Sequence, residues 1–153
     1  MLDQVTDNLY IGNARLIQYI PSLQGEGISS ILKLHETPPE RPSNTFRLFD
    51  CPIPDGEPIL ANTFDSWLDF LGSEISQGHK VLVICGAGIS RSSTAVLAYL
   101  TSTGQTLPDA YRLLCARHPS TSPHPLLWES LIHYFDLPYT RLDIFQWHMD
   151  VQG

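Results

Sequence analysis

The chain has 153 residues, of which 42% are hydrophobic, and a formal net charge of -7. This length suits one domain with a substantial core, and the acidic excess disfavours nucleic acids and anionic membranes as partners. No apolar run approaches the roughly 18 residues of a membrane span, and the N-terminal stretch is neither basic nor apolar enough for a signal peptide. The sequence therefore predicts a single domain over residues 1–153, located in the cytoplasm.

Residues 5–34 carry the first predicted elements. Residues 5–13 read as a strand with an Asp-Asn turn and a terminal Gly-Asn turn. Apolar spacings of three and four over residues 16–23 predict a short helix interrupted at Pro21, and residues 28–34 predict a second strand.

A proline-rich polar loop is predicted over residues 35–44. His35 and Glu36 at its start have the residue types of a metal pair. Since no second ligand cluster accompanies them, we expect both side chains to face solvent.

The middle of the chain predicts a strand, a helix and a second strand. Residues 45–53 have strand character, and apolar residues recur at three and four between Phe64 and Ile75, before Gly78. Residues 81–84 form an unbroken apolar run, typical of a strand buried on both faces of a sheet. Such a βαβ unit implies parallel strands, and ligands bind at the carboxyl ends of such strands.

Cys85 directly follows this buried strand, and a helix-compatible stretch covers residues 92–100. The intervening loop consists of Gly86, Ala87, Gly88, Ile89 and Ser90, and it is followed by Arg91 and Ser92. Backbone NH groups in such a loop converge where the positive end of the helix dipole points, which forms a cradle for an anion. Arg91 adds a planar fork of donors that matches two phosphate oxygens. A thiol in this field is expected to be a nucleophile at neutral pH.

The alternative interpretation is that Cys85 is a small core residue at the end of a buried strand. A cysteine and an arginine six positions apart are weak support for a site on their own. The complete pattern of strand, cysteine, paired glycines, hydroxyls, Arg91 and helix is far more specific, and it favours a catalytic site.

Three further segments complete the chain. Residues 95–100 are apolar nearly all round and predict a buried helix, and Thr106 begins a second helix. Residues 126–135 predict a last packing helix after a break rich in proline. The extension at residues 139–153 is too apolar for a free tail, and we expect it to pack on the domain rather than bind a partner.

The loop sequence CGAGISRS resembles the signature of cysteine-dependent protein tyrosine phosphatases, and its Ala-Gly-x-Ser-Arg-Ser ending is most similar to the dual-specificity branch. The resemblance extends over about residues 5–137. It implies that Cys85 attacks phosphorus while Arg91 and the loop amides hold the phosphoryl oxygens. It further implies a phosphocysteine intermediate, assistance by Ser92 when the thiolate departs, and no metal or cofactor.

The chemistry also requires an acid that protonates the leaving oxygen. Asp55 is the candidate, because it lies in the turn-prone loop over residues 52–58, thirty residues before Cys85. This spacing resembles that of the family's general-acid loop. Asp50 and Glu57 are the rival carboxylates.

The sequence departs from the family pattern at two positions. The family usually has histidine immediately before the cysteine, where this chain has Ile84, and that histidine helps to order the loop and favour the thiolate. The linker over residues 117–125 resembles the family's basic, proline-bounded linker, which implies that it supports the phosphate loop. His124 stands in it where asparagine is commoner.

The cysteine count limits redox chemistry. Cys51, Cys85 and Cys115 are an odd number without metal-ligand spacing, so a disulfide framework is not expected, and reduced thiols suit the cytosol. A reversible disulfide between Cys85 and Cys51 is one alternative. The favoured interpretation is that Cys51 and Cys115 are core residues.

The sequence therefore predicts an α/β fold with a central, mostly parallel sheet flanked by helices. The predicted function is a monomeric protein phosphatase that hydrolyses phosphotyrosine, and phosphoserine or phosphothreonine as well, in phosphorylated protein substrates. Two alternatives stay open: a phosphatase of a nonprotein phosphoester such as a phosphoinositide, glycan or RNA end, and a phosphoprotein-binding pseudophosphatase.

Overall fold

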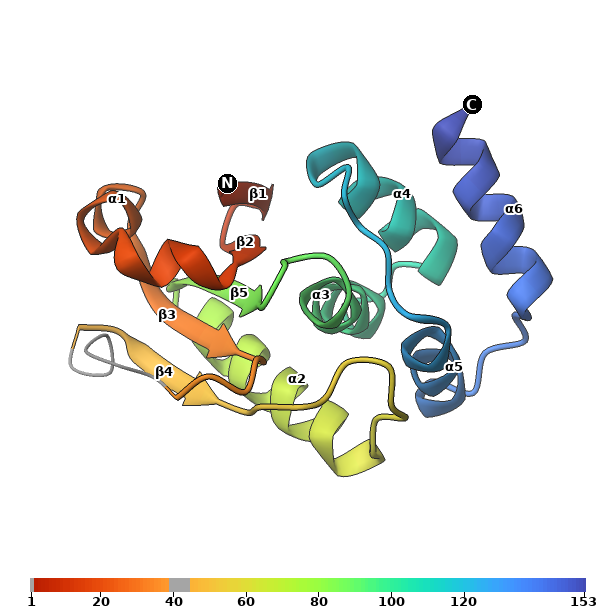
Figure 1. Cartoon of the computed structure of the whole chain (residues 1–153), viewed down its shortest axis with the longest axis horizontal. Helices are drawn as coiled ribbons and strands as arrows, with labels where there is room; N and C mark the ends of the chain where they lie inside the picture. Colours follow the sequence, from red (N-terminus) through yellow and green to blue (C-terminus); the bar gives the residue numbers. More distant parts are fainter. Residues whose placement is uncertain (1, 39–44) are drawn as a thin grey trace.

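One five-stranded sheet organises the chain, with the strand order β1-β2-β5-β3-β4 (Figure 1). The computed structural model describes residues 2–38 and 45–153, so part of the loop predicted over residues 35–44 lies outside the described residues. The strands are β1 (Leu2–Thr6), β2 (Leu9–Asn13), β3 (Ile28–Lys33), β4 (Arg47–Asp50) and β5 (Lys80–Cys85). β1 runs antiparallel to β2, whereas the other three pairings are parallel. The predicted mostly parallel sheet is confirmed.

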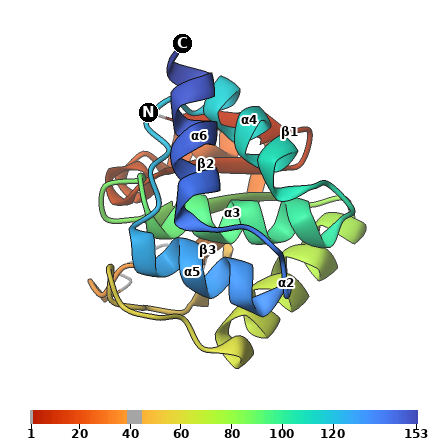
Figure 2. The same cartoon turned by 90° about the vertical axis from the view of Figure 1, so that its right-hand side faces the viewer.

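Helices cover both faces of the sheet and extend beyond it. They are the 3-10 helix η1 (Ala14–Gln18), α1 (Ile20–Gly25), α2 (Ala61–Ser76), α3 (Arg91–Ser102), α4 (Leu107–Arg117), α5 (Pro125–Tyr134) and α6 (Arg141–Gln152). Side chains of η1 and α1 join a smaller core on one face, and those of α2 and α3 join the larger core on the other. α4, α5 and α6 lie beyond α3, with α6 outermost (Figures 1 and 2). No helix among the described residues is long and apolar enough to cross a bilayer.

The two cores divide the side chains of β5 between them. Val81, Val83 and Cys85 belong to the larger core, and Leu82 and Ile84 belong to the smaller one. Successive side chains of a strand point to opposite faces, which explains why a continuous apolar run suits this central strand. β5 consequently ends with Cys85 on the side of α3.

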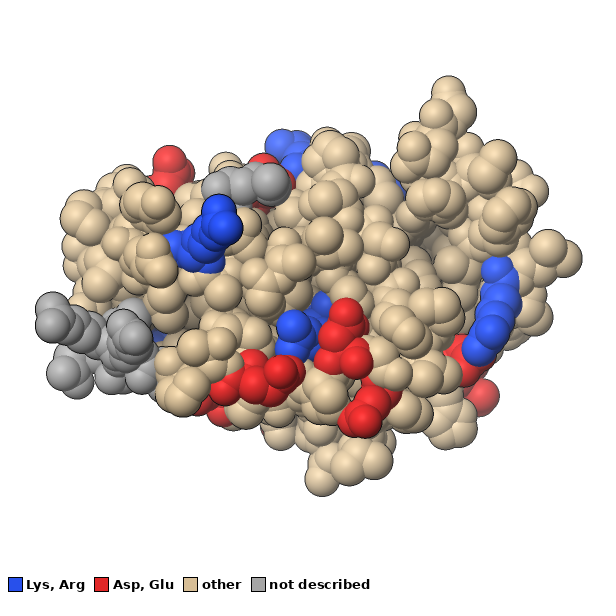
Figure 3. All heavy atoms as spheres, viewed as in Figure 1, with Lys and Arg blue, Asp and Glu red and all other residues tan. Residues whose placement is uncertain are grey.

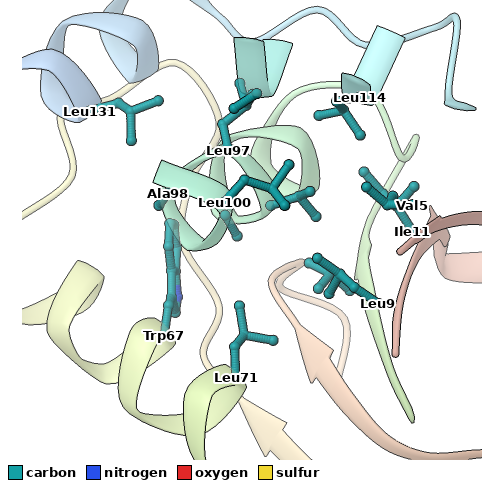
Figure 4. Packing of buried hydrophobic residues seen from close by; sticks show 14 of the residues in the cluster. Val5, Leu9, Ile11, Trp67, Leu71, Leu97, Ala98, Leu100, Leu114 and Leu131 are labelled. Atoms are coloured by element: carbon teal, nitrogen blue, oxygen red, sulfur yellow. The ribbon is translucent and has the colours of Figure 1, made fainter. Parts of the chain in front are cut away.

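The larger core surrounds α3, as the all-round apolar pattern predicted. Trp67 and Leu71 of α2, Leu114 of α4 and Leu131 of α5 lie around it, and Leu97 projects from α3 among them (Figure 4). Their burial removes apolar surface from water on several sides of one helix. The start of α3, which carries Arg91, is thereby held rigidly against the end of β5.

The predicted N-terminal elements differ in detail from the structure. The single strand expected over residues 5–13 is a hairpin, because Asp7 and Asn8 form a full turn between β1 and β2. The helix expected over residues 16–23 is η1 followed by α1. The break falls at Tyr19, and Pro21 lies in the first turn of α1, where its missing NH costs nothing.

Helix ends follow the predicted signals. Thr106 caps α4 by accepting a hydrogen bond from the NH of Asp109, and Gly78, just after α2, has a φ of +84° that favours glycine. A capping box of Thr140 and Asp143 begins α6. These local devices fix where each helix starts or ends.

The C-terminal extension packs with one face. Trp147 of α6 is buried against Trp128 and Tyr139 in edge-to-face contacts. Leu142 and Phe145, in contrast, are 75% and 60% exposed. The extension thus covers part of the core and presents an apolar surface of its own.

Candidate active site

The predicted phosphate loop joins β5 to α3 and lines a pocket of about 260 Å³ at the carboxyl end of the parallel strands. This is where open α/β sheets bind ligands. The residues that line the catalytic pocket are Asp55, Cys85, Ala87, Ile89, Ser90, Arg91, Ser122 and His124. Asp55 therefore shares one cavity with Cys85 and Arg91, although it lies thirty residues before Cys85 in the sequence.

Cys85 is 2% exposed, and its Sγ atom lies 3.2 Å from Oγ of Ser92, within hydrogen-bonding distance. Ser92 is buried in the first turn of α3. A hydroxyl in this place can donate to a thiolate, which stabilises negative charge on sulfur. The positive end of the α3 dipole points at the same place.

Arg91 is anchored at one end of its guanidinium. Nη1 donates to Oε1 of Glu36 at 2.6 Å and to the carbonyl oxygen of Ile53 at 2.9 Å. Nη2 is the nearest atom to the position that a Cβ on Gly86 would take, at 3.3 Å, so this nitrogen lies beside the loop. The anchored side chain is thus oriented toward the place where a phosphoryl group would lie.

Glu36 was not predicted as a site residue. It follows β3, and β3 is the direct neighbour of β5 in the sheet. Because neighbouring parallel strands end at the same edge, a carboxylate just after β3 was a usable signal for a partner of Arg91.

The expectation that His35 faces solvent is wrong. His35 is 7% exposed, and its carbonyl oxygen accepts a hydrogen bond from Nζ of the buried Lys33 at 2.6 Å. Burial, with the nearby charges of Lys33 and Arg91, lowers the pKa of His35, so the ring is neutral beside the arginine. Lys33 also pairs with Asp50 at 2.8 Å, which fixes the chain ahead of Glu36.

Asp55 is held at the mouth of the catalytic pocket. Its Oδ1 accepts a hydrogen bond from Oγ of Ser90 at 2.8 Å, and that hydroxyl accepts one from the NH of His124 at 2.9 Å. The ring of His124 lies against Gly56, whose φ of +80° permits the sharp turn. The loop that carries the carboxylate is thereby tied to the phosphate loop.

The two rival carboxylates are placed differently. Asp50 is engaged by Lys33, and neither Asp50 nor Glu57 is among the described residues that line the catalytic pocket. Position therefore favours Asp55 among the three.

His118 supports the loop from below. The ring is 1% exposed, with Nε2 2.5 Å from the carbonyl oxygen of Gly88 and Nδ1 2.6 Å from Oδ2 of Asp3. Each ring nitrogen therefore faces an acceptor oxygen, one on the phosphate loop and one on β1. The NH of Ser122 also donates to the carbonyl oxygen of Ile89 at 3.0 Å. The linker over residues 117–125 therefore supports the phosphate loop, as the resemblance implied.

Ile84 fills the smaller core with no exposed surface. An apolar side chain has no donor with which to order the loop. In this chain the side chain that reaches the carbonyl oxygen of Gly88 is that of His118, which comes from the end of α4 instead of from β5. Sequence reasoning missed this residue because its partner, Gly88, lies thirty positions away.

Gly88 offers a direct test of the loop geometry. Its φ is +72°, and a Cβ there would lie 2.8 Å from the carbonyl carbon and oxygen of Gly12. We expect Gly88→Ala to lose about 1–3 kcal/mol of unfolding free energy, as strained backbone positions do, together with most phosphate release. Denaturant unfolding and turnover of p-nitrophenyl phosphate measure the two effects.

Gly72→Ala is the matched control. A Cβ at Gly72, within α2, meets no atom inside 4 Å, so the substitution is expected to leave activity intact and to stabilise the helix by roughly 0.5–1 kcal/mol. Equal stability and activity for Gly88→Ala and the wild type would contradict the loop geometry.

The other cysteines lie apart from the catalytic pocket. Cys51 and Cys115 are free and half-buried and pack against the larger core. Burial raises the pKa of both thiols, which makes them poorer thiolates. These observations suit the core interpretation rather than a redox role for Cys51.

The surface around the catalytic pocket is acidic. Figure 3 shows acidic side chains beside basic ones in the middle of this face, over the segment that joins β4 to α2 in Figure 1. Asp55 and Glu57 belong to that segment and are exposed, and Glu36 pairs with Arg91.

Among residues 2–38 and 45–153, no group of three His, Cys, Asp or Glu residues is arranged to hold a metal ion.

Comparisons with known proteins match this arrangement. The family described as "Dual specificity phosphatase, catalytic domain" matches residues 9–136. Mouse dual specificity protein phosphatase 18 is 31% identical over 140 residues, which cover 87% of this chain and 72% of that protein. Mouse dual specificity protein phosphatase 2 is 29% identical over 123 residues, which cover 79% of this chain but only 39% of that longer protein.

The fold is shared with solved structures. The crystal structure of human tyrosine phosphatase-like serine/threonine/tyrosine-interacting protein superposes with a TM-score of 0.81 at 25% identity, covering 88% of this chain and 95% of that one. The family match, the 31% identity to a dual specificity protein phosphatase and the shared fold agree with the phosphate loop around Cys85. The chain belongs to the dual specificity phosphatase family of cysteine-dependent protein phosphatases.

Proposed function

We propose that the protein hydrolyses phosphotyrosine, and also phosphoserine and phosphothreonine, in protein substrates through a phosphocysteine intermediate. The observation that carries this proposal is the lining of one pocket by Cys85, Arg91 and Asp55. A nucleophile, an anion-binding group and a proton donor within one cavity are the parts that phosphoryl transfer to a side chain requires.

In the first step, the thiolate of Cys85 attacks phosphorus, and the bond between phosphorus and the leaving oxygen breaks. Arg91 and the backbone NH groups of the loop over residues 86–90 hold the nonbridging oxygens as charge redistributes. Protonated Asp55 gives its proton to the leaving oxygen, so the side chain departs as a neutral hydroxyl.

In the second step, water attacks the phosphocysteine, and the bond between sulfur and phosphorus breaks. Asp55, now a carboxylate, accepts a proton from the water. Ser92, whose Oγ lies 3.2 Å from Sγ, donates a hydrogen bond to the departing thiolate of Cys85. The enzyme returns to its starting state with inorganic phosphate released.

Pocket size and charge support a phosphorylated side chain as substrate. Small residues, including Ala87, Ser90 and Ser122, line the catalytic pocket, which leaves room for shorter side chains as well as tyrosine. Among the described residues that line the catalytic pocket, Arg91 is the one lysine or arginine, and it is already paired with Glu36. An acidic border disfavours the additional phosphates of a phosphoinositide or an RNA end.

The proposal also covers the location and oligomeric state of the protein: a monomer in a reducing compartment. The mechanism needs a reduced thiol at Cys85, and the described cysteines are free, which suits the cytoplasm. The catalytic pocket draws its lining from one chain, so no second copy is needed to complete it.

A matched substrate panel tests the function. One peptide sequence carrying phosphotyrosine, phosphoserine or phosphothreonine is compared with a phosphoinositide, a glycan phosphate and an RNA end. We expect kcat/KM to be highest for the phosphotyrosine peptide and measurable for the other two peptides. Preference for a nonprotein phosphoester would contradict the proposal, as would phosphopeptide binding without phosphate release.

A further inference from the structure

A second pocket, of about 340 Å³, lies between α4, α5, α6 and the linker that precedes α5. We call it the apolar subsite. Its lining residues are Tyr111, Ser122, Pro123, Pro125, Trp128, Arg141, Ile144, Phe145 and His148. The part contributed by α6 follows residue 136, where the match to the family domain ends. This chain's own extension therefore builds one wall.

The apolar subsite adjoins the catalytic pocket. Ser122 lines both cavities, and the chain from Ser122 to His124 separates them. Two hydrogen bonds fix this partition to the phosphate loop, from the NH of Ser122 to the carbonyl of Ile89 and from the NH of His124 to Oγ of Ser90. Only one pass of the chain, residues 122–124, separates the two cavities, so one bound peptide can reach both.

The walls of the apolar subsite suit an apolar side chain. Tyr111 and Trp128 are buried and meet edge to face, with ring centroids 5.3 Å apart. Phe145, which α6 contributes to the lining, is 60% exposed, so an entering side chain would cover an aromatic ring that water now covers. Rigid aromatic walls of this kind bind apolar anchors of a partner.

Charge does not favour an anion in the apolar subsite. Among the described residues that line the apolar subsite, Arg141 is the one lysine or arginine. The guanidinium of Arg141 is paired with Glu129, with Nε 2.6 Å from Oε1. His148 is engaged through Nδ1 with the hydroxyl of Tyr111 at 3.3 Å. The polar groups at the edge therefore already have partners.

We propose that the apolar subsite binds one apolar side chain, leucine or phenylalanine in kind, of the protein segment whose phosphorylated residue occupies the catalytic pocket. This inference rests on the proposed function and adds a specificity determinant to it. The volume suits one side chain rather than a helix, and the continuity through Ser122 points to the substrate as the occupant. An extended peptide advances roughly 3.3 Å per residue, and the two cavities share Ser122, so the anchor would lie within a few residues of the phosphorylated one.

A peptide series tests this inference. The parent is a phosphotyrosine peptide with serine at all neighbouring positions, and each relative carries one leucine, up to about four residues away on either side. We expect one placement, or two adjacent ones, to raise kcat/KM about fivefold to tenfold over the parent. Equal kcat/KM for all placements would overturn the inference.

Phe145→Ser removes the exposed wall of the apolar subsite. The expected result is that the ratio of kcat/KM between the preferred leucine peptide and its serine parent falls to near one. Leu142→Ser is the matched control, because Leu142 is exposed on the same helix but does not line the apolar subsite, and it is expected to keep the wild-type ratio. An unchanged ratio in Phe145→Ser would overturn the inference.

A binding measurement separates failure of the subsite from failure of the enzyme. Fluorescence anisotropy compares the affinities of Cys85→Ser for the same two labelled peptides, with and without Phe145→Ser. A leucine preference that Phe145→Ser abolishes supports the apolar subsite even if the wild type releases no phosphate, a result that would contradict only the proposed function. If sedimentation instead shows a wild-type dimer that Phe145→Ser dissociates, a second copy occupies the surface and the inference fails.

Discussion

Cys85→Ser is expected to abolish phosphate release, with kcat reduced by at least about 10³-fold on every phosphoester that the wild type hydrolyses. A serine hydroxyl at the base of the catalytic pocket stays protonated at neutral pH and cannot replace a thiolate as nucleophile. The two side chains differ by one atom, so the fold and the pocket are retained. Phosphate release at saturating substrate, with thermal unfolding in parallel, measures both properties.

Cys115→Ser is the control for this prediction. Cys115 is a half-buried thiol of α4 that lies outside the lining of the catalytic pocket. We expect its replacement to leave kcat within about twofold of the wild type, since surface and half-buried changes of this size rarely disturb a separate site. Turnover that survived in Cys85→Ser would exclude Cys85 as the nucleophile.

Asp55→Asn is expected to lower kcat on phosphotyrosine peptides by about 10²-fold, the usual contribution of a positioned general acid. An amide can still accept the hydrogen bond from Ser90, so the loop is expected to keep its place. The loss should be smaller for p-nitrophenyl phosphate, because its leaving group departs readily without a proton. The comparison of the two substrates isolates proton donation from binding.

The pH profile gives a second signature of Asp55. Catalysis by an anionic nucleophile together with a general acid gives kcat/KM a bell-shaped pH profile, and its fall at higher pH belongs to the acid. Asp55→Asn should retain the rise and lose the fall. Glu57→Gln, which changes an exposed carboxylate of the same loop, should keep the bell shape; if Glu57→Gln loses it instead, Glu57 is the acid.

The central part of the fold could be predicted because its signals are local. The unbroken apolar run of β5, the all-round apolar helix α3 and the Thr106 cap of α4 each follow from neighbouring residues. The separation of β1 from β2 was missed because the expected strand began at residue 5, so that most of β1, Leu2–Thr6, lay outside it. The antiparallel pairing, in which Leu2 lies opposite Gly12, shows that the chain reverses direction at the turn that contains Asp7.

The candidate site was predictable where its residues are contiguous. Residues 85–92 form one local motif, and their chemistry follows from the thiol, the glycines and Arg91. Glu36 and His118 escaped prediction because their roles depend on pairing across the fold: Glu36 contacts Arg91 across 55 positions, and His118 contacts Asp3 across 115. Hydrophobic periodicity does not single out Glu36 or His118, so their contacts can be inferred only once the order of the strands in the sheet is known.

The burial of His35 has the same origin. A histidine at the start of a proline-rich loop has the local features of a solvent-facing residue. Nζ of Lys33, at the end of β3, donates a hydrogen bond to the carbonyl oxygen of His35, and this contact holds His35 in a buried position. A tertiary contact thus overrides the local expectation, and it brings Glu36 to Arg91.

The phosphocysteine intermediate tests the central claim most directly. The protein is mixed with a phosphotyrosine peptide, quenched in acid within one turnover, digested and analysed by mass spectrometry. The mechanism predicts one phosphoryl group on the peptide that contains Cys85, and a greater yield of it in Ser92→Ala, which lacks the hydroxyl that assists departure of the thiolate. Phosphate release without any phosphoryl group on Cys85, or with the group on another residue, would contradict the account.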